Sequence, residues 1–166
     1  MPDRESEPAP SPSSVPASVT VLAFDFGEQR IGVAVGETAL RSAQPLEIIA
    51  AEDNAARFAA IARLVAEWQP GLLVVGLPFH PDGAEHEVTR LARRFARRLE
   101  GRFGLPVALV DERYTSVAAE SALRERGVSG ARLEAALDAA SAAEILLAYH
   151  EQKRRDQGAA SADVLP

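Results

Sequence analysis

Acidic residues follow two short apolar stretches of the sequence, at the points where strands would end. Asp25 comes directly after Val21–Phe24, and Asp111 and Glu112 come directly after Val107–Val110. Ligand sites in open α/β sheets lie beyond the carboxyl ends of the strands. Clustered carboxylates repel one another and destabilise a fold unless a cation lies between them. We therefore expect these acids to form a metal site at one edge of a sheet.

A third acid, Asp138, lies among small residues near the C-terminus, in the segment Leu137–Ala143. Aspartate is a poor helix former, and small neighbours would let a helix approach the sheet closely. Hard divalent cations such as Mg²⁺ or Mn²⁺ suit an all-oxygen site. Two such ions roughly 3.5–4 Å apart can activate a water and stabilise the leaving oxygen of a phosphodiester. Three converging acids therefore indicate a metal-dependent nuclease.

Each acid also has a simpler structural interpretation. An aspartate after a strand is often only a turn residue or a helix cap. Asp111 and Glu112 could pair with Arg113 or cap a helix at Thr115–Ser116, and Asp138 could be a solvated helical residue. The nuclease hypothesis depends on the combination of acids and not on any one of them.

The elements that must position these acids follow from the hydropathy pattern. Apolar, β-branched runs predict strands, and apolar residues at helical spacing predict helices. The expected order is a hairpin or three-stranded meander, then helix, strand, helix, strand and two helices. Alternation in the second half implies parallel strands with right-handed crossovers, which gives an α/β fold with an RNase-H-like, mixed five-stranded sheet flanked by helices. The expected strands cover 19–24, 31–35, 46–49, 72–75 and 107–110, and the expected helices cover about 54–69, 88–99, 116–126 and 131–150.

Composition indicates one folded domain with two polar ends. The chain has 166 residues, of which 47% are hydrophobic and 25% are charged, as in globular proteins that bury a core. Residues 1–20 hold five prolines and five serines, so we expect a disordered leader over 1–18. The RNase-H-like domain should cover 19–150, and the polar segment 151–166 should be a flexible tail.

Several classes of protein are excluded by what the sequence lacks. Without cysteine, the chain has no disulfide, no thiolate zinc site and no cysteine nucleophile. It has no apolar stretch of membrane-spanning length and no signal-peptide pattern, so we expect a cytoplasmic protein without membrane contact. The net charge of −6 is unusual for a nucleic-acid-binding protein. However, 17 of the 18 basic residues are arginine, which binds phosphate with a bidentate fork.

The predicted helix near residues 90–102 has a strongly basic face. Its arginines are Arg90, Arg93, Arg94, Arg97, Arg98 and Arg102. Such a face is often only solvated. The alternative is that it follows a nucleic-acid backbone, with Arg94 and Arg98 as contacts one helical turn apart. Arg30 is open to two similar interpretations, as a phosphate contact beside the acids or as a structural salt bridge.

Four motifs, in order along the chain, resemble those of the YqgF/RuvX family. The segment Asp25–Gly32 matches the signature D-x-G-x-x-R-I-G of that family. The other three matches are Val75–Pro78 with Asp82–Gly83, then Asp111–Thr115, and then Asp138 with Ala142–Ala143 and Ile145–Leu146. Members of the family resemble Holliday junction resolvases and are regarded as nucleases of small-subunit ribosomal RNA precursors.

The resemblance implies a catalytic, metal-binding triad of Asp25, Glu112 and Asp138, with Asp111 as an auxiliary ligand and Mg²⁺ or Mn²⁺ as cofactor. It implies processing of the 5′ end of pre-16S rRNA. Cleavage of branched DNA and a non-catalytic binding module are the alternatives.

The resemblance does not specify which residues contact nucleic acid or which oligomer the protein forms. We expect Arg30, Arg113, Arg94 and Arg98 to contact nucleic acid, in a monomer or a homodimer. The sequence departs from the family pattern at Gly36–Glu37, His80 and Ser116, and no triad acid is affected.

Overall fold

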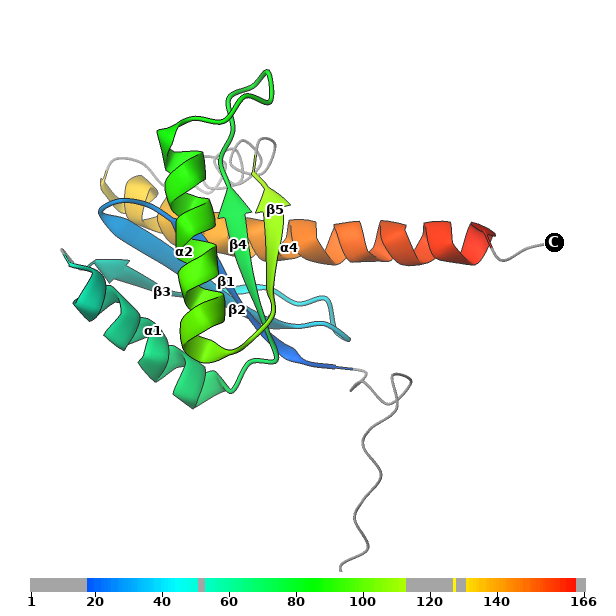
Figure 1. Ribbon diagram of the computed structural model, residues 1–166, viewed down its shortest axis with the longest axis horizontal. Coiled ribbons are helices and arrows are strands. Elements are labelled where there is room, and N and C mark those ends of the chain that lie inside the picture. Colours follow the sequence, from blue (N-terminus) through cyan, green and yellow to red (C-terminus); the bar gives the residue numbers. More distant parts are fainter. Residues whose placement is uncertain (1–17, 51–52, 113–126, 128–130, 164–166) are drawn as a thin grey trace, which may run out of the picture.

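The computed structural model describes residues 18–50, 53–112, 127 and 131–163. A five-stranded sheet lies between α1 and α2 on one face and α4 on the other (Figure 1). The strands are β1 (Thr20–Phe26), β2 (Arg30–Glu37), β3 (Gln44–Ala50), β4 (Leu72–Leu77) and β5 (Val107–Asp111). The helices are α1 (Asn54–Trp68), α2 (Glu87–Phe103) and α4 (Ala131–Asp163).

The sheet has the order β3-β2-β1-β4-β5. Strands β1, β2 and β3 form an antiparallel meander, whereas β4 pairs in parallel with both β1 and β5. The predicted α/β class and mixed five-stranded sheet are therefore confirmed. The helix predicted over 116–126 lies outside the described residues.

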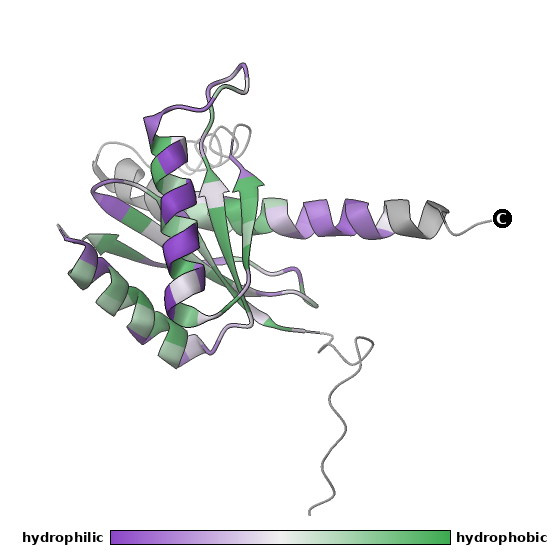
Figure 2. Ribbon diagram, viewed as in Figure 1, coloured by the Kyte–Doolittle hydropathy of each residue, from purple (hydrophilic) through white to green (hydrophobic). Residues whose placement is uncertain are grey.

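Strand β1 divides the core into two apolar clusters, because successive side chains of a strand point to opposite faces of the sheet. Leu22 and Phe24 pack in one cluster with side chains of α1 and α2. Val21 and Ala23 pack in a second cluster with side chains of α4. Continuing the alternation places Asp25 on the α4 face and Phe26 on the face covered by α1 and α2. Figure 2 shows the apolar strands between the helices.

Local signals explain where α1 and α2 begin and end. At the start of α1, the Asp53 carboxylate accepts a hydrogen bond of 2.7 Å from the Ala56 amide. At the start of α2, His86 and Thr89 form a capping box. Gly104, with φ of 63°, ends α2 in the left-handed conformation that glycine adopts without strain.

The last helix, α4, is longer than predicted. It continues to Asp163, although the sequence predicted a helix ending near residue 150 and a flexible tail. The polar composition suggested the tail, but no proline lies between Glu151 and Asp163 to stop the helix. Glu151 also forms ion pairs with Arg154 at 3.4 Å and Arg155 at 3.6 Å, a spacing that supports helical structure. The end of α4 therefore projects beyond the sheet (Figure 1).

No helix in the described part of the chain is both long and apolar enough to cross a membrane.

Candidate active site

Two of the predicted acids meet at the carboxyl ends of the parallel strands. Asp25 lies in β1, Glu112 directly follows β5, and β4 lies between these two strands. The two carboxyl groups are hydrogen-bonded to each other. The amide of Glu112 donates a hydrogen bond of 3.0 Å to the carbonyl oxygen of Leu77, which extends the β4–β5 ladder by one residue. The pairing of the strands therefore fixes the backbone that carries Glu112.

Gly76 of β4 leaves the space that the two acids need. A Cβ atom on Gly76 would lie 2.7 Å from the carboxyl carbon of Glu112, and it would overlap Oε1 of Glu112 and Cδ1 of Ile145. Real Cβ atoms essentially never come closer than 3.0 Å to another atom. The Glu112 carboxyl group and a fully buried side chain of α4 thus occupy the volume that a side chain at residue 76 would take.

Burial of Glu112 changes its ionisation. Desolvation, followed by the charge of Asp25, the hydrogen bond with Asp25 and the charge of Asp111, raises the pKa of Glu112 to about 9. At neutral pH the Asp25–Glu112 pair therefore holds a proton. A divalent cation would satisfy the same oxygens without that proton, so the donor set fits the Mg²⁺ or Mn²⁺ that the sequence predicts.

Without added metal, we expect the free energy of unfolding to fall as the pH rises from about 4.5 towards 9. In the unfolded chain Glu112 ionises near 4.5, whereas in the folded protein it keeps its proton to about 9. The folded state binds more protons in this window, so each rise in pH favours the unfolded state. Thermal unfolding in a metal chelator across this range tests the prediction.

Glu112→Gln is the control for the pH prediction, because it keeps the shape of the side chain and removes its titration. This variant should lose that part of the pH dependence, and it should unfold at a higher temperature than the wild type at pH 8. Equal pH profiles for the two proteins would contradict the raised pKa.

Asp111 lies on the opposite face of the sheet from Glu112. It is exposed, and the alternation along β5 places it on the face opposite Val110, which packs in the cluster with α4. Its charge still contributes to the raised pKa of Glu112. The role of Asp111 as an auxiliary ligand stays a prediction.

The backbone of Asp138 lies in α4, whereas its side chain is outside the described part of the structure. Residue 138 precedes Ala142 by four residues and Ile145 by seven, which is one and two helical turns. Both later residues are fully buried, and Ile145 lies over Gly76 beside Glu112. No group of three His, Cys, Asp or Glu residues with metal-binding geometry occurs among the described side chains. The third ligand therefore stays a prediction.

The predicted arginine contacts do not all share one face. Arg30 is exposed at the start of β2, and Arg113 lies outside the described residues. Arg94 and Arg98 lie on α2, which covers the face opposite Glu112. The structure therefore brings together Asp25 and Glu112, but not these two arginines.

This architecture defines an RNase-H-like α/β protein. It resembles Thermus thermophilus RuvC in complex with a Holliday junction substrate, with a TM-score of 0.52 and 16% identity over 83% of this chain and 96% of that one. It also resembles a fowlpox virus resolvase in complex with substrate Holliday junction DNA, with a TM-score of 0.52 and 11% identity over 81% and 98% of the two chains. At these identities the similarity shows a shared fold.

The chain belongs to the RuvX family, since the family profile described as "RuvX: Holliday junction resolvase" matches residues 19–152. A relative from Chromobacterium violaceum is 61% identical over 132 residues, which are 79% of this chain and 96% of the relative. A relative from Nitrosomonas europaea is 58% identical over 135 residues, or 81% and 91% of the two chains. Both are provisionally named pre-16S rRNA nuclease. The family predicted from the four motifs is confirmed.

Proposed function

We propose that the protein is a divalent-metal-dependent nuclease that hydrolyses phosphodiester bonds of RNA and processes the 5′ end of pre-16S rRNA. The observation that carries the proposal is the half-buried, hydrogen-bonded Asp25–Glu112 pair, held together over Gly76 at the carboxyl ends of β1 and β5. Perturbed carboxyl groups of this kind cluster at functional sites. The names of the similar proteins support the substrate. A protein acting on this RNA works in the cytoplasm, where ribosomes assemble.

Each residue of the site has a defined part in this proposal. Asp25 and Glu112 would hold the cation and Asp138 would complete the ligand set, and Glu112 would release its proton to the solvent on binding the cation. Gly76 keeps the space over β4 clear for the Glu112 carboxyl group, and the buried Ile145 side chain occupies the rest of that space. When bound, the metal supplies activation of the attacking water and stabilisation of the leaving oxygen.

Cleavage of branched DNA is the second candidate function. The description of the family profile and the two structures of similar fold favour it. A non-catalytic binding module is the third candidate. It gives no reason for two half-buried carboxyl groups that share a proton, because removing such a pair from water destabilises the fold.

Cleavage assays with four substrates distinguish these functions. The substrates are an RNA carrying the 5′ end of pre-16S rRNA, an unrelated single-stranded RNA, a single-stranded DNA and a four-way DNA junction. With Mg²⁺ or Mn²⁺, we expect cleavage of the precursor RNA at the highest rate and none in a metal chelator. Preferential cleavage of the junction would support the resolvase function instead. Absence of cleavage of all four, together with absence of Mn²⁺ binding, would contradict a nuclease.

A further inference from the structure

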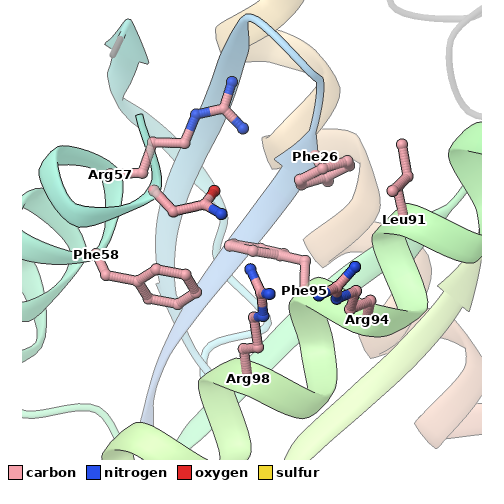
Figure 3. Close-up of a pocket in the computed structure, with 8 residues that line it drawn as sticks. Phe26, Arg57, Phe58, Leu91, Arg94, Phe95 and Arg98 are labelled. Atoms are coloured by element: carbon pink, nitrogen blue, oxygen red, sulfur yellow. The ribbon is translucent and has the colours of Figure 1, made fainter. Parts of the chain in front are cut away.

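A pocket between α1 and α2 has a lining that the proposed active site does not explain. Its volume is about 190 Å³, and it lies on the face of the sheet opposite Glu112. Figure 3 shows Arg57 reaching into it from α1, Arg94 and Arg98 reaching into it from α2, and the ring of Phe95 between them. We call this cavity the α1–α2 pocket.

The charged side chains that line the α1–α2 pocket are all arginines, namely Arg57, Arg94 and Arg98. Earlier in α2, by contrast, Arg90 pairs with Glu87 at 3.0 Å, and Arg93 pairs with Glu85 at 2.7 Å. No carboxylate of the described chain forms an ion pair with Arg94 or Arg98. Arg94 and Arg98 therefore bring to the pocket two guanidinium charges that an anion would neutralise.

Aromatic rings make the floor of the α1–α2 pocket rigid. The ring centroid of Phe95 lies 5.1 Å from that of Phe26 and 6.0 Å from that of Phe58. Phe58 and Phe95 belong to the buried core, and the guanidinium of Arg102 stacks over Phe58 at 4.1 Å from the ring centroid. The pocket is thus preformed. Its volume is below the roughly 300–1,000 Å³ of sites for drug-sized ligands, so it suits a single small group.

The α1–α2 pocket and the candidate active site lie at the same end of β1. Phe26 lines the pocket, and the preceding residue, Asp25, faces the other side of the sheet. A nucleic-acid strand at Asp25 could therefore pass around this end of the sheet and reach the pocket.

We propose that the α1–α2 pocket binds one phosphate group of the substrate strand, remote from the bond that is cleaved. Arg94 and Arg98 are one helical turn apart and contribute two planar guanidinium groups, each able to bind phosphate oxygens in a bidentate manner. Arg57 contributes a third from α1. The occupation of the pocket by the substrate strand rests on the proposed function, whereas the binding of a phosphate group does not.

Titration of the metal-free, full-length protein with inorganic phosphate tests the pocket independently of cleavage. The readout is the NMR signals of the arginine Nε–Hε groups. We expect saturable shifts for Arg57, Arg94 and Arg98. In the Arg94→Gln/Arg98→Gln variant, the shift of Arg57 should be lost, and in the matched Arg90→Gln variant it should persist. Shifts that are equal over all arginines of α2, or that do not saturate, would overturn the proposal.

Binding of an uncleavable single-stranded RNA, measured as a function of salt concentration, tests whether the α1–α2 pocket binds a phosphate group of the substrate strand. The Arg94→Gln/Arg98→Gln variant should bind roughly tenfold more weakly, because hydrogen bonds to charged groups are lost. Its slope of log binding constant against log salt should be about 0.7 smaller, the loss of one phosphate contact. Arg90→Gln should leave both quantities unchanged.

The two measurements separate the sources of the phosphate group. Saturable binding of inorganic phosphate with unchanged RNA affinity and slope would overturn the assignment to the substrate strand. Failure of the wild type to cleave any nucleic acid would contradict the proposed function and leave the phosphate titration unaffected. In a protein that cleaves, the double variant should raise KM and leave kcat close to the wild-type value, because the acids lie on the other face.

Discussion

Replacement of Asp25 by asparagine is expected to reduce cleavage of RNA to background and to leave the fold intact. The substitution keeps the shape of the side chain but removes a negative oxygen that the cation needs. Glu112→Gln should have the same effect. Since the two carboxyl groups act as a unit, the double variant should be little worse than either single variant. Single-turnover cleavage and Mn²⁺ binding by calorimetry measure the two losses.

Glu67→Gln is the matched control for the substitutions of the acids. Glu67 is an exposed acid of α1 that pairs with Arg63 at 3.8 Å. This variant should cleave RNA and bind Mn²⁺ as the wild type does. Circular dichroism and the thermal midpoint of each variant report whether the fold is kept. Near-normal turnover of Asp25→Asn in Mg²⁺ or Mn²⁺ would remove Asp25 from the proposed ligand set.

Replacement of Gly76 by valine is expected to abolish cleavage and also to destabilise the protein. Even the first carbon of the new side chain would overlap the Glu112 carboxyl group and Ile145, so either Glu112 or α4 must move. Overpacking of a core typically costs about 1–3 kcal/mol. The free energy of unfolding in urea and the cleavage rate measure the two effects.

Gly101→Ala is the matched control for Gly76→Val. Gly101 lies in α2, and a Cβ atom there would have no other atom within 4 Å. This variant should be more stable than the wild type by about 0.5–1 kcal/mol, because alanine loses less entropy in a helix than glycine. Unchanged cleavage and stability in Gly76→Val would show that Glu112 does not need the space above β4.

The convergence of Asp25 and Glu112 could be predicted because it depends on local signals. Both acids follow apolar runs, and parallel strands bring their carboxyl ends to one edge of the sheet. The role of Gly76 could not be predicted, although the motif Val75–Pro78 contains it. Its contacts come from residues 36 and 69 positions further along the chain, and no pattern within one element shows them.

Arg57 was missed for a related reason. In the sequence it is one more arginine on a helix, and its participation in a pocket depends on how α1 packs beside α2. The continuation of α4 beyond residue 150 was missed because the sequence there has no apolar stripe that would predict a helix. Ion pairs with Glu151 support this part of the helix instead. Side chains outside the described structure, those of Asp138 and Arg113, keep the roles predicted from the motifs.

The last two residues of β1 face opposite sides of the sheet, and this restricts how the strand can change in length. Loss of one residue from β1 would exchange the two faces, placing an aspartate among the phenylalanines under α2 and a phenylalanine beside Glu112. Loss of two residues would preserve the faces and shorten only the strand. Among homologues of this protein, insertions and deletions inside β1, between Val21 and Asp25, should therefore occur in even numbers.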